Sequence, residues 1–163
     1  MSHAGKVTVL YTFTGGDDGG NPDGPLVRDT EGNLYGIAQG GGTFGNGVVF
    51  KVDGSGKETV LHPFAGGADG AIPTPGLMRD AAGNLYGTTL FGGTLGNGVI
   101  FKVSPTGKET IVHTFSGGPD GGLPAYVTLI SDSAGNLYGT TSEGGTFGNG
   151  VVFKLTLPVP SQH

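Results

Sequence analysis

One unit of about 51 residues is written three times in this chain. The pentapeptide Gly-Asn-Leu-Tyr-Gly begins at residues 32, 83 and 135, so its copies are 51 and 52 residues apart. Residues 32–70 and 83–121 are identical at 25 of 39 aligned positions without a gap. A fixed period of this size is typical of proteins built from stacked structural repeats. The chain is therefore expected to fold as three copies of one unit.

Composition alone points elsewhere, because 36 Gly and 10 Pro in 163 residues are typical of low-complexity or disordered chains. Regular apolar runs between the glycines argue against disorder. Charged residues make up only 13% of the chain, which is too few for a self-repelling disordered polymer. These features predict a folded, loop-rich, all-β protein.

The middle unit contains four short apolar runs separated by turn residues. They cover residues 77–80, 85–89, 99–103 and 109–115, and the glycine-rich stretch 91–98 reads as a long loop. Four strands at about ten-residue spacing, repeated at a period near 50, are typical of a β-propeller blade. A parallel β-helix is the alternative, but its coils are usually shorter. We expect four-stranded antiparallel blades, three per chain.

The repeat is out of phase with the ends of the sequence. A single domain over residues 6–157 divides into units near 14–64, 65–115 and 116–157 plus 6–13, with flexible ends at 1–5 and 158–163. Residues 6–13 align with 57–64 and 108–115, and so read as a fourth strand without the first three. Residues 151–157 read as a third strand without a fourth. The N-terminal strand is thus expected to complete a blade, which leaves no open sheet edge.

Three blades are fewer than the four to eight of known propellers. The simplest source of the missing blades is a second copy of the chain, joined head to tail as a homodimeric six-bladed ring. A larger ring, an open filament and a piece of a longer repeat protein are the alternatives. The expected assembly strands carry Val7, Val9, Tyr11 and Phe13 on one side and Val151 and Phe153 on the other.

Both kinds of long glycine-rich loop are expected on one face of the molecule. Repeat-equivalent polar residues in these loops are the candidate ligand-binding residues: Thr43, Thr94, Thr146, Asn46, Asn97, Asn149, Asp18, Asp69 and Asp120. The alternative is turn chemistry, since Asn tolerates a left-handed backbone and Asp bonds nearby backbone groups. Saccharides and a cation are the candidate ligands, and residues 17–24 gather the most oxygen donors for calcium. That stretch lacks the EF-hand spacing, so no metal site and no cofactor are predicted.

Charge and motif content exclude several classes of function. The net charge is −5, which argues against nucleic acid and anionic membranes, and no apolar stretch is long enough for membrane insertion. The chain has no cysteine, so there is no disulfide framework. His62 and His113 occupy the position of Tyr11, which favours an aromatic packing role over acid–base catalysis. No nucleophile, base and orienting group converge, and we expect no enzyme.

Lys51, Lys102 and Lys154 each precede a fourth strand or its expected position. They are expected to lie near enough to Glu58 or Glu109 to form cross-strand ion pairs. An exposed pair of this kind contributes at most about 1 kcal/mol.

The motifs at residues 83–89, 92–103 and 107–121 resemble the GloVer tandem repeat of bacterial exported proteins. The resemblance covers nearly the whole chain, because several spaced motifs recur in order. It implies a bacterial source and a secreted or cell-surface location, and it implies no activity. The leading hypothesis is a non-enzymatic extracellular scaffold or interaction module that self-assembles by strand exchange. A multivalent lectin-like, glycan-binding propeller and a filament subunit are the alternatives.

Overall fold

Three antiparallel sheets follow one another along the chain in a computed structural model that describes residues 4–158. Sheet 1 contains β1 (Gly20–Arg28), β2 (Leu34–Gly40), β3 (Val48–Val52) and β4 (Glu58–Pro63). Sheet 2 contains β5 (Ala71–Pro73), β6 (Met78–Arg79), β7 (Leu85–Phe91), β8 (Val99–Val103) and β9 (Glu109–Thr114). Sheet 3 contains β10 (Ile130–Ser131), β11 (Leu137–Thr141) and β12 (Val151–Leu155). The all-β prediction is confirmed.

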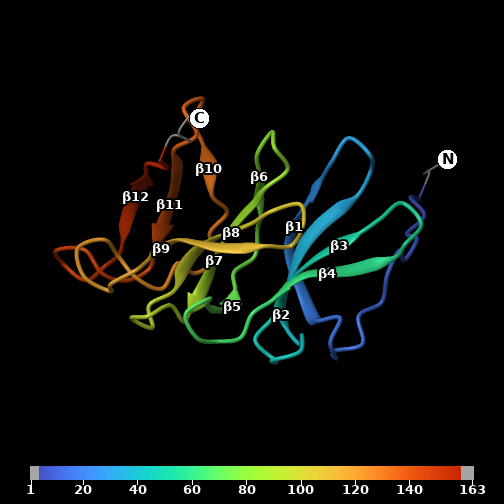
Figure 1. Cartoon of the computed structure of the whole chain (residues 1–163), viewed down its shortest axis with the longest axis horizontal. Coiled ribbons are helices and arrows are strands. Elements are labelled where there is room, and N and C mark those ends of the chain that lie inside the picture. Colours follow the sequence, from blue (N-terminus) through green and yellow to red (C-terminus); the bar gives the residue numbers. More distant parts are fainter. Residues whose placement is uncertain (1–3, 159–163) are drawn as a thin grey trace.

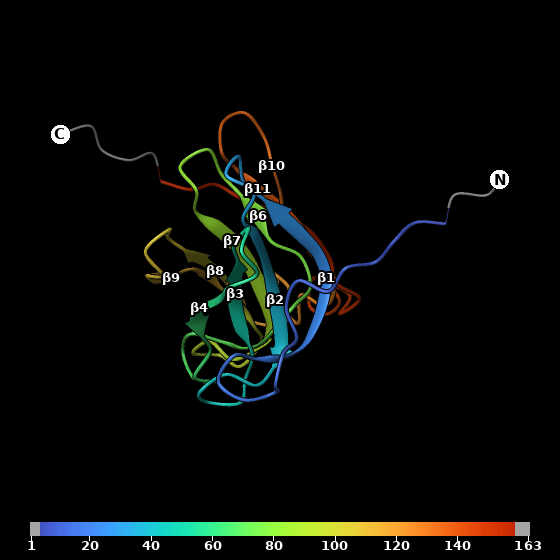
Figure 2. The ribbon, with the colours of Figure 1, turned by 90° about the vertical axis from the view of Figure 1, so that its right-hand side faces the viewer.

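The sheets lie side by side along the long axis of the molecule (Figure 1). The long glycine-rich loops gather at the lower end of this view, and the hairpin turns that lead into β2, β7 and β11 lie at the upper end. Figure 2, turned by 90°, shows the strands of successive sheets overlapping along that axis. The described residues contain no helix, and hence none that could cross a membrane.

The strands of sheet 2 agree with the sequence prediction except in the first. The chain pairs with β7 twice, through β5 and again through β6, instead of forming one strand. Pro73, Pro75 and Gly76 lie in and after β5, and proline has no N–H to donate to a ladder. In sheet 1 the corresponding β1 is continuous, with a register irregularity between Asp23 and Val27.

Residues 6–13, named here the N-terminal segment, form no strand within the single chain, and their predicted pairing with another copy stays a prediction. No strand of residues 4–158 pairs with them. Val7 and Val9 are accordingly 91% and 73% exposed. The expected flexible ends at 1–5 and 158–163 lie largely outside the described residues.

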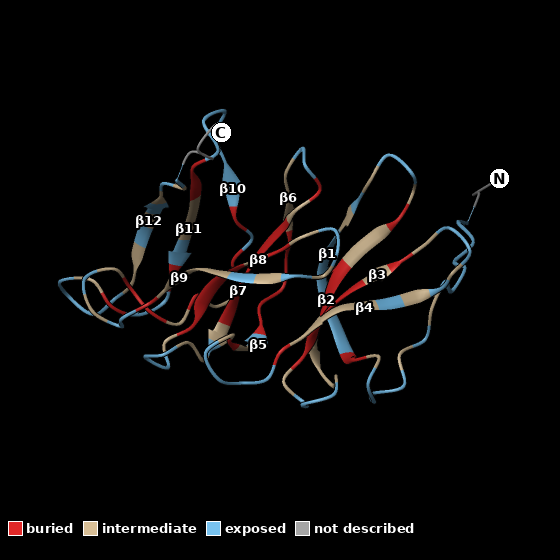
Figure 3. Ribbon diagram, viewed as in Figure 1, coloured by how far each residue is buried: buried red, intermediate tan, exposed pale blue. Residues whose placement is uncertain are grey.

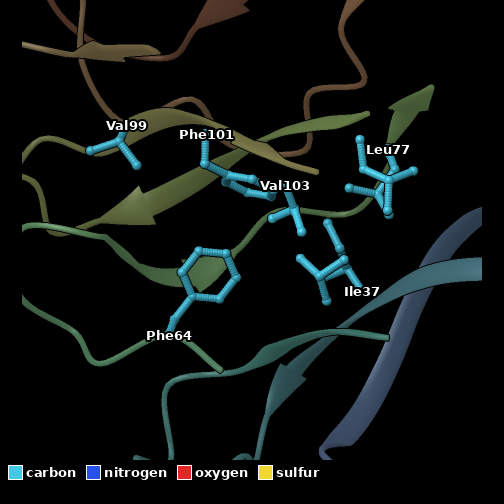
Figure 4. Close-up of a cluster of buried hydrophobic side chains, with 8 residues drawn as sticks. Ile37, Phe64, Leu77, Val99, Phe101 and Val103 are labelled. Carbon is cyan, nitrogen blue, oxygen red and sulfur yellow. The ribbon is translucent and has the colours of Figure 1, made fainter. Parts of the chain in front are cut away.

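The main core lies between sheets 1 and 2. Ile37, Val49 and Phe64 of the first unit pack against residues of sheet 2, including Val99 and Phe101 (Figure 4). A second core lies between sheets 2 and 3 and contains Ile100, Phe115, Leu129 and Leu137. Figure 3 shows the buried residues concentrated in the middle of the molecule and exposed positions along both outer sheets. Each sheet is thus stabilised by the sheets beside it.

The Gly-Asn-Leu-Tyr-Gly motif is explained by an aspartate three residues before it. Asp29 accepts hydrogen bonds from the Asn33 backbone N–H at 2.9 Å, from Asn33 Nδ2 at 2.8 Å and from the Tyr35 hydroxyl at 2.9 Å. Asp80 and Asp132 bind the same groups of the later copies. These bonds hold the pKa of Asp132 down, to about 2. The motif is therefore a turn lock, and sequence reasoning missed its aspartate although the spacing is constant.

Candidate functional site

The outer edge of β12 is unpaired among the described residues. β3 and β8, its equivalents, pair with fourth strands β4 and β9, whereas β12 pairs only with β11. Beside this edge lies a hollow of about 360 Å³. Ile100, His113, Phe115, Asp120, Val151 and Phe153 are among its lining residues. The hollow lies where a fourth strand of sheet 3 would run.

The N-terminal segment packs on sheet 1 as a fourth strand packs on the next sheet. The rings of Phe13 and Phe50 meet edge to face at 4.8 Å between centroids. The equivalent rings meet in the same way within the chain: Phe64 and Phe101 at 5.0 Å, and Phe115 and Phe153 at 5.4 Å. The segment therefore occupies the place of the last strand of a preceding unit.

Two further contacts repeat in the same pattern. The Tyr11 hydroxyl donates to Asp18 at 2.8 Å, and His113 Nε2 lies 3.0 Å from Asp120. A Cβ on Gly56 would lie 2.8 Å from the Leu10 carbonyl oxygen, as a Cβ on Gly107 would from that of Leu61. The fourth-strand placement of the segment thus extends over its whole C-terminal half, although no strand among the described residues pairs with it.

The two outer faces of the molecule carry residues whose equivalents are buried between its sheets. Val49 and Ile100 are fully buried against the following sheet, whereas Val152, the equivalent residue of β12, is 84% exposed. On the opposite face Leu77 and Leu129 are 3% and 1% exposed, whereas their equivalent Leu26 is 53% exposed. Each outer face therefore presents apolar side chains that are covered elsewhere in the chain.

The loop aspartates that sequence analysis nominated bind their own loops. Asp18 accepts from the Thr14 backbone N–H at 2.8 Å, and Asp69 accepts from that of Ala65 at 2.8 Å. Hydrogen bonds from Thr14 and Ser116 hold the pKa of Asp18 and of Asp120 below the ordinary value, although burial opposes the shift. These bonds run four residues back along the chain, to the backbone at the start of the same loop.

The loop asparagines join neighbouring units. The Ile72 N–H donates to the Asn46 carbonyl at 3.0 Å, and the Leu123 N–H donates to that of Asn97 at 2.9 Å. Asn97 Nδ2 also donates to the Ser116 carbonyl at 3.0 Å. Asn149 holds the equivalent position after β11, and Thr43, Thr94 and Thr146 are exposed in the same loops. A role of these residues in ligand binding stays a prediction.

The predicted lysine–glutamate pairs are wrong. In the described residues the ion pairs join His62 to Asp69 and His113 to Asp120, and none joins lysine to glutamate. The register sets Lys51 opposite Thr59 and Glu58 opposite Val52, so lysine and glutamate point to opposite faces of the sheet. Lys102 Nζ instead lies 5.9 Å from the centre of the Tyr86 ring.

Within residues 4–158 no group of three or more His, Asp or Glu side chains is arranged to hold a metal ion. His62 and His113 stack edge to face on Phe64 and Phe115, as Tyr11 does on Phe13. Burial lowers the pKa of His62, and the nearby Asp69 opposes this only in part. Both histidines therefore pack as aromatic rings against a neighbouring phenylalanine.

Three antiparallel sheets in tandem, formed by three copies of one sequence unit, define a tandem-repeat β protein. The profile described as the Gloeobacter/Verrucomicrobia repeat matches residues 1–162, and the chain belongs to that family. No curated protein sequence matches the chain.

Similar solved structures include a gluconolactonase from Xanthomonas campestris, at 15% identity and a TM-score of 0.50, over 86% of this chain and 48% of that chain. A putative gluconolactonase matches at 16% identity and a TM-score of 0.46, over 83% and 44%. The chain thus spans less than half the length of these two structures. At this identity the first likeness concerns the fold alone.

Proposed function

We propose that the chain is a non-enzymatic repeat module whose three sheets are propeller blades, and that a second copy completes the ring. The N-terminal segment of one copy pairs with β12 of the other, and the reverse pairing closes the circle. The observation that carries this proposal is the aromatic contact of Phe13 with Phe50, because it holds the segment in fourth-strand position while its backbone pairs with no strand among the described residues.

The pairing register follows from the two complete sheets. Lys51 pairs with Thr59 and Lys102 with Thr110, so Lys154 of one copy lies opposite Thr8 of the other. The same rule sets Leu155 opposite Val7 and Phe153 opposite Val9. The segment then fills the hollow beside β12 with apolar side chains, and its backbone satisfies that edge.

Six blades fit the size of the similar fold. The chain covers 48% of the Xanthomonas structure, so two copies supply about the full length of that propeller-type chain. Head-to-tail contacts either close into a ring or run on as a filament. Sheet twist favours closure at four to eight blades, which makes the dimer the smallest closed assembly of whole copies.

The assembled ring would serve as a secreted or cell-surface scaffold. Its Gly-rich loops gather on one face, which supports multivalent contact with a partner or a glycan through Thr43, Asn46 and their equivalents. Those positions repeat like groups, whereas catalysis needs unlike groups that converge.

A pair of cysteines tests the assembly, since the chain has none of its own. We expect Thr8→Cys with Lys154→Cys to form two disulfides between copies, giving a covalent dimer on non-reducing gels. The matched control, Lys51→Cys with Thr59→Cys, has the same register inside one sheet and should cross-link within the monomer. A ladder of higher species would indicate the filament. A 16.3 kDa monomer by light scattering, without intermolecular cross-links, would contradict the proposal.

A further inference from the structure

An arginine of sheet 2 reaches across to an aromatic ring of sheet 1. The guanidinium carbon of Arg79, in β6, lies 5.9 Å from the centre of the Tyr35 ring in β2. Arginine above an aromatic face is attracted by the ring's negative quadrupole. Arg79 corresponds to Arg28 and Ser131 in the other units, and Tyr35 corresponds to Tyr86 and Tyr138.

The other two rings show what happens without that arginine. Between sheets 2 and 3, the position equivalent to Arg79 is occupied by Ser131. There Lys102 Nζ, of the same sheet as Tyr86, lies 5.9 Å from the centre of the Tyr86 ring. Lys154 lies likewise 5.8 Å from the Tyr138 ring. Lys51, opposite Tyr35 in the register, makes no such contact within the part of the chain that the structure describes. The arginine of the next sheet therefore takes the place of the lysine.

Arg28 already has the placement that Arg79 uses. Its Nη2 lies 3.1 Å from the Cβ position of Gly32, as Nη2 of Arg79 does from that of Gly83. Arg28 is exposed on the outer face of sheet 1, next to the exposed Leu26. It forms no ion pair within residues 4–158.

The surface around Tyr138 is open and suited to an arginine. A hollow of about 340 Å³ lies there, lined by Tyr138, Ile130 and Val152 among others. Ile130 is 65% exposed and Val152 84% exposed. Asp132 accepts the Tyr138 hydroxyl at 2.8 Å, so a carboxylate lies at the edge of the ring and attracts a cation.

We infer that Arg28 of a second copy stacks on Tyr138 and displaces Lys154, which fixes the angle and partner at the joint between copies. This rests on the proposed assembly, to which it adds a second contact apart from strand exchange. Leu26 of the second copy then covers Val152, as Leu77 contributes to the core that contains Val49. The joint then combines a cation–π contact with a contact between apolar side chains.

The test is the dimer dissociation constant, measured by sedimentation over a dilution series of the full chain. We expect Arg28→Ala to raise it about 10-fold or more, because a closed dimer contains two joints. Tyr138→Leu should have a similar effect, and the double variant should be little worse than either single one. Tyr138→Phe keeps the ring and should restore most of the affinity.

Arg79→Ala is the matched control, because it removes the same contact inside the chain. It should lower the melting temperature and leave the dissociation constant within about twofold. A dissociation constant that Arg28→Ala leaves unchanged would overturn this contact while the assembly stands. A wild-type chain that stays monomeric at every concentration would overturn both.

Discussion

Two glutamates at the start of β4 and β9 are held in unfavourable surroundings. One carboxylate oxygen, Oε1, of Glu58 and of Glu109 is buried without a hydrogen-bond partner. Burial raises the pKa of Glu109 to about 7, and the charge of Asp69 adds to the shift. Position 7 holds valine instead, so a segment that inserts beside β12 brings no carboxylate into the joint.

Glu109→Gln should therefore stabilise the protein at alkaline pH. The folded-state pKa lies above the ordinary value of 4.5, so the favourable state is the protonated one. The contribution of the protonated Glu109 to the free energy of unfolding is complete below pH 4.5 and is lost as pH rises through about 7. Thermal melts should show little difference from wild type at pH 5 and a higher melting temperature for the variant at pH 8. Glu31→Gln, in an exposed turn, controls for the loss of one negative charge; an equal gain there would refute the explanation.

At the scale of elements, periodicity and turn chemistry were enough to locate β7, β8 and β9 almost to the residue. They failed for β5, because a strand of three residues that ends at Pro73 has no alternating pattern to read. The edge-to-face stack of Phe64 on Phe101 is likewise invisible in the sequence, since it joins different units. The loop aspartates were found by their recurrence, but their bonds four residues back depend on the folded loop.

The second glycine of the repeated pentapeptide leaves room for the phenylalanine ring of the third strand. A Cβ on Gly87 would lie 2.5 Å from the Phe101 ring and 3.2 Å from Leu77. Phe101 is fully buried and has no room to withdraw. Gly87→Ala should cost about 1–3 kcal/mol, or a drop of several degrees in melting temperature. Gly54→Ala, with no atom within 4 Å of its Cβ position, should leave the melting temperature unchanged. Equal effects of the two changes would show that packing under Phe101 is not limiting.

At the scale of the whole molecule, only the middle unit has a neighbouring sheet on both of its faces. The outer face of sheet 1 is covered only by the N-terminal segment, whose Phe13 packs on a cluster that includes Phe50, and the outer face of sheet 3 carries the exposed Val152. Val152 and Leu26 mark those two faces, and their equivalents in the other units are buried. In a stacked repeat protein such faces are either capped by polar residues or covered by another unit. Here the exposed residues Leu26 and Val152 are apolar, which favours faces that another unit covers.

Val152→Asp should abolish the assembly without unfolding the chain. The side chain is 84% exposed in the single chain, so a carboxylate there remains hydrated. In the ring it would be buried where Val49 and Ile100 are fully covered, and an unpaired buried charge is strongly unfavourable. We expect light scattering to report a monomer and circular dichroism to report an unchanged β spectrum. Phe147→Asp, at a loop residue that is 89% exposed, should still form the dimer. A dimer that tolerates Asp at position 152 would mean that this face stays in solvent.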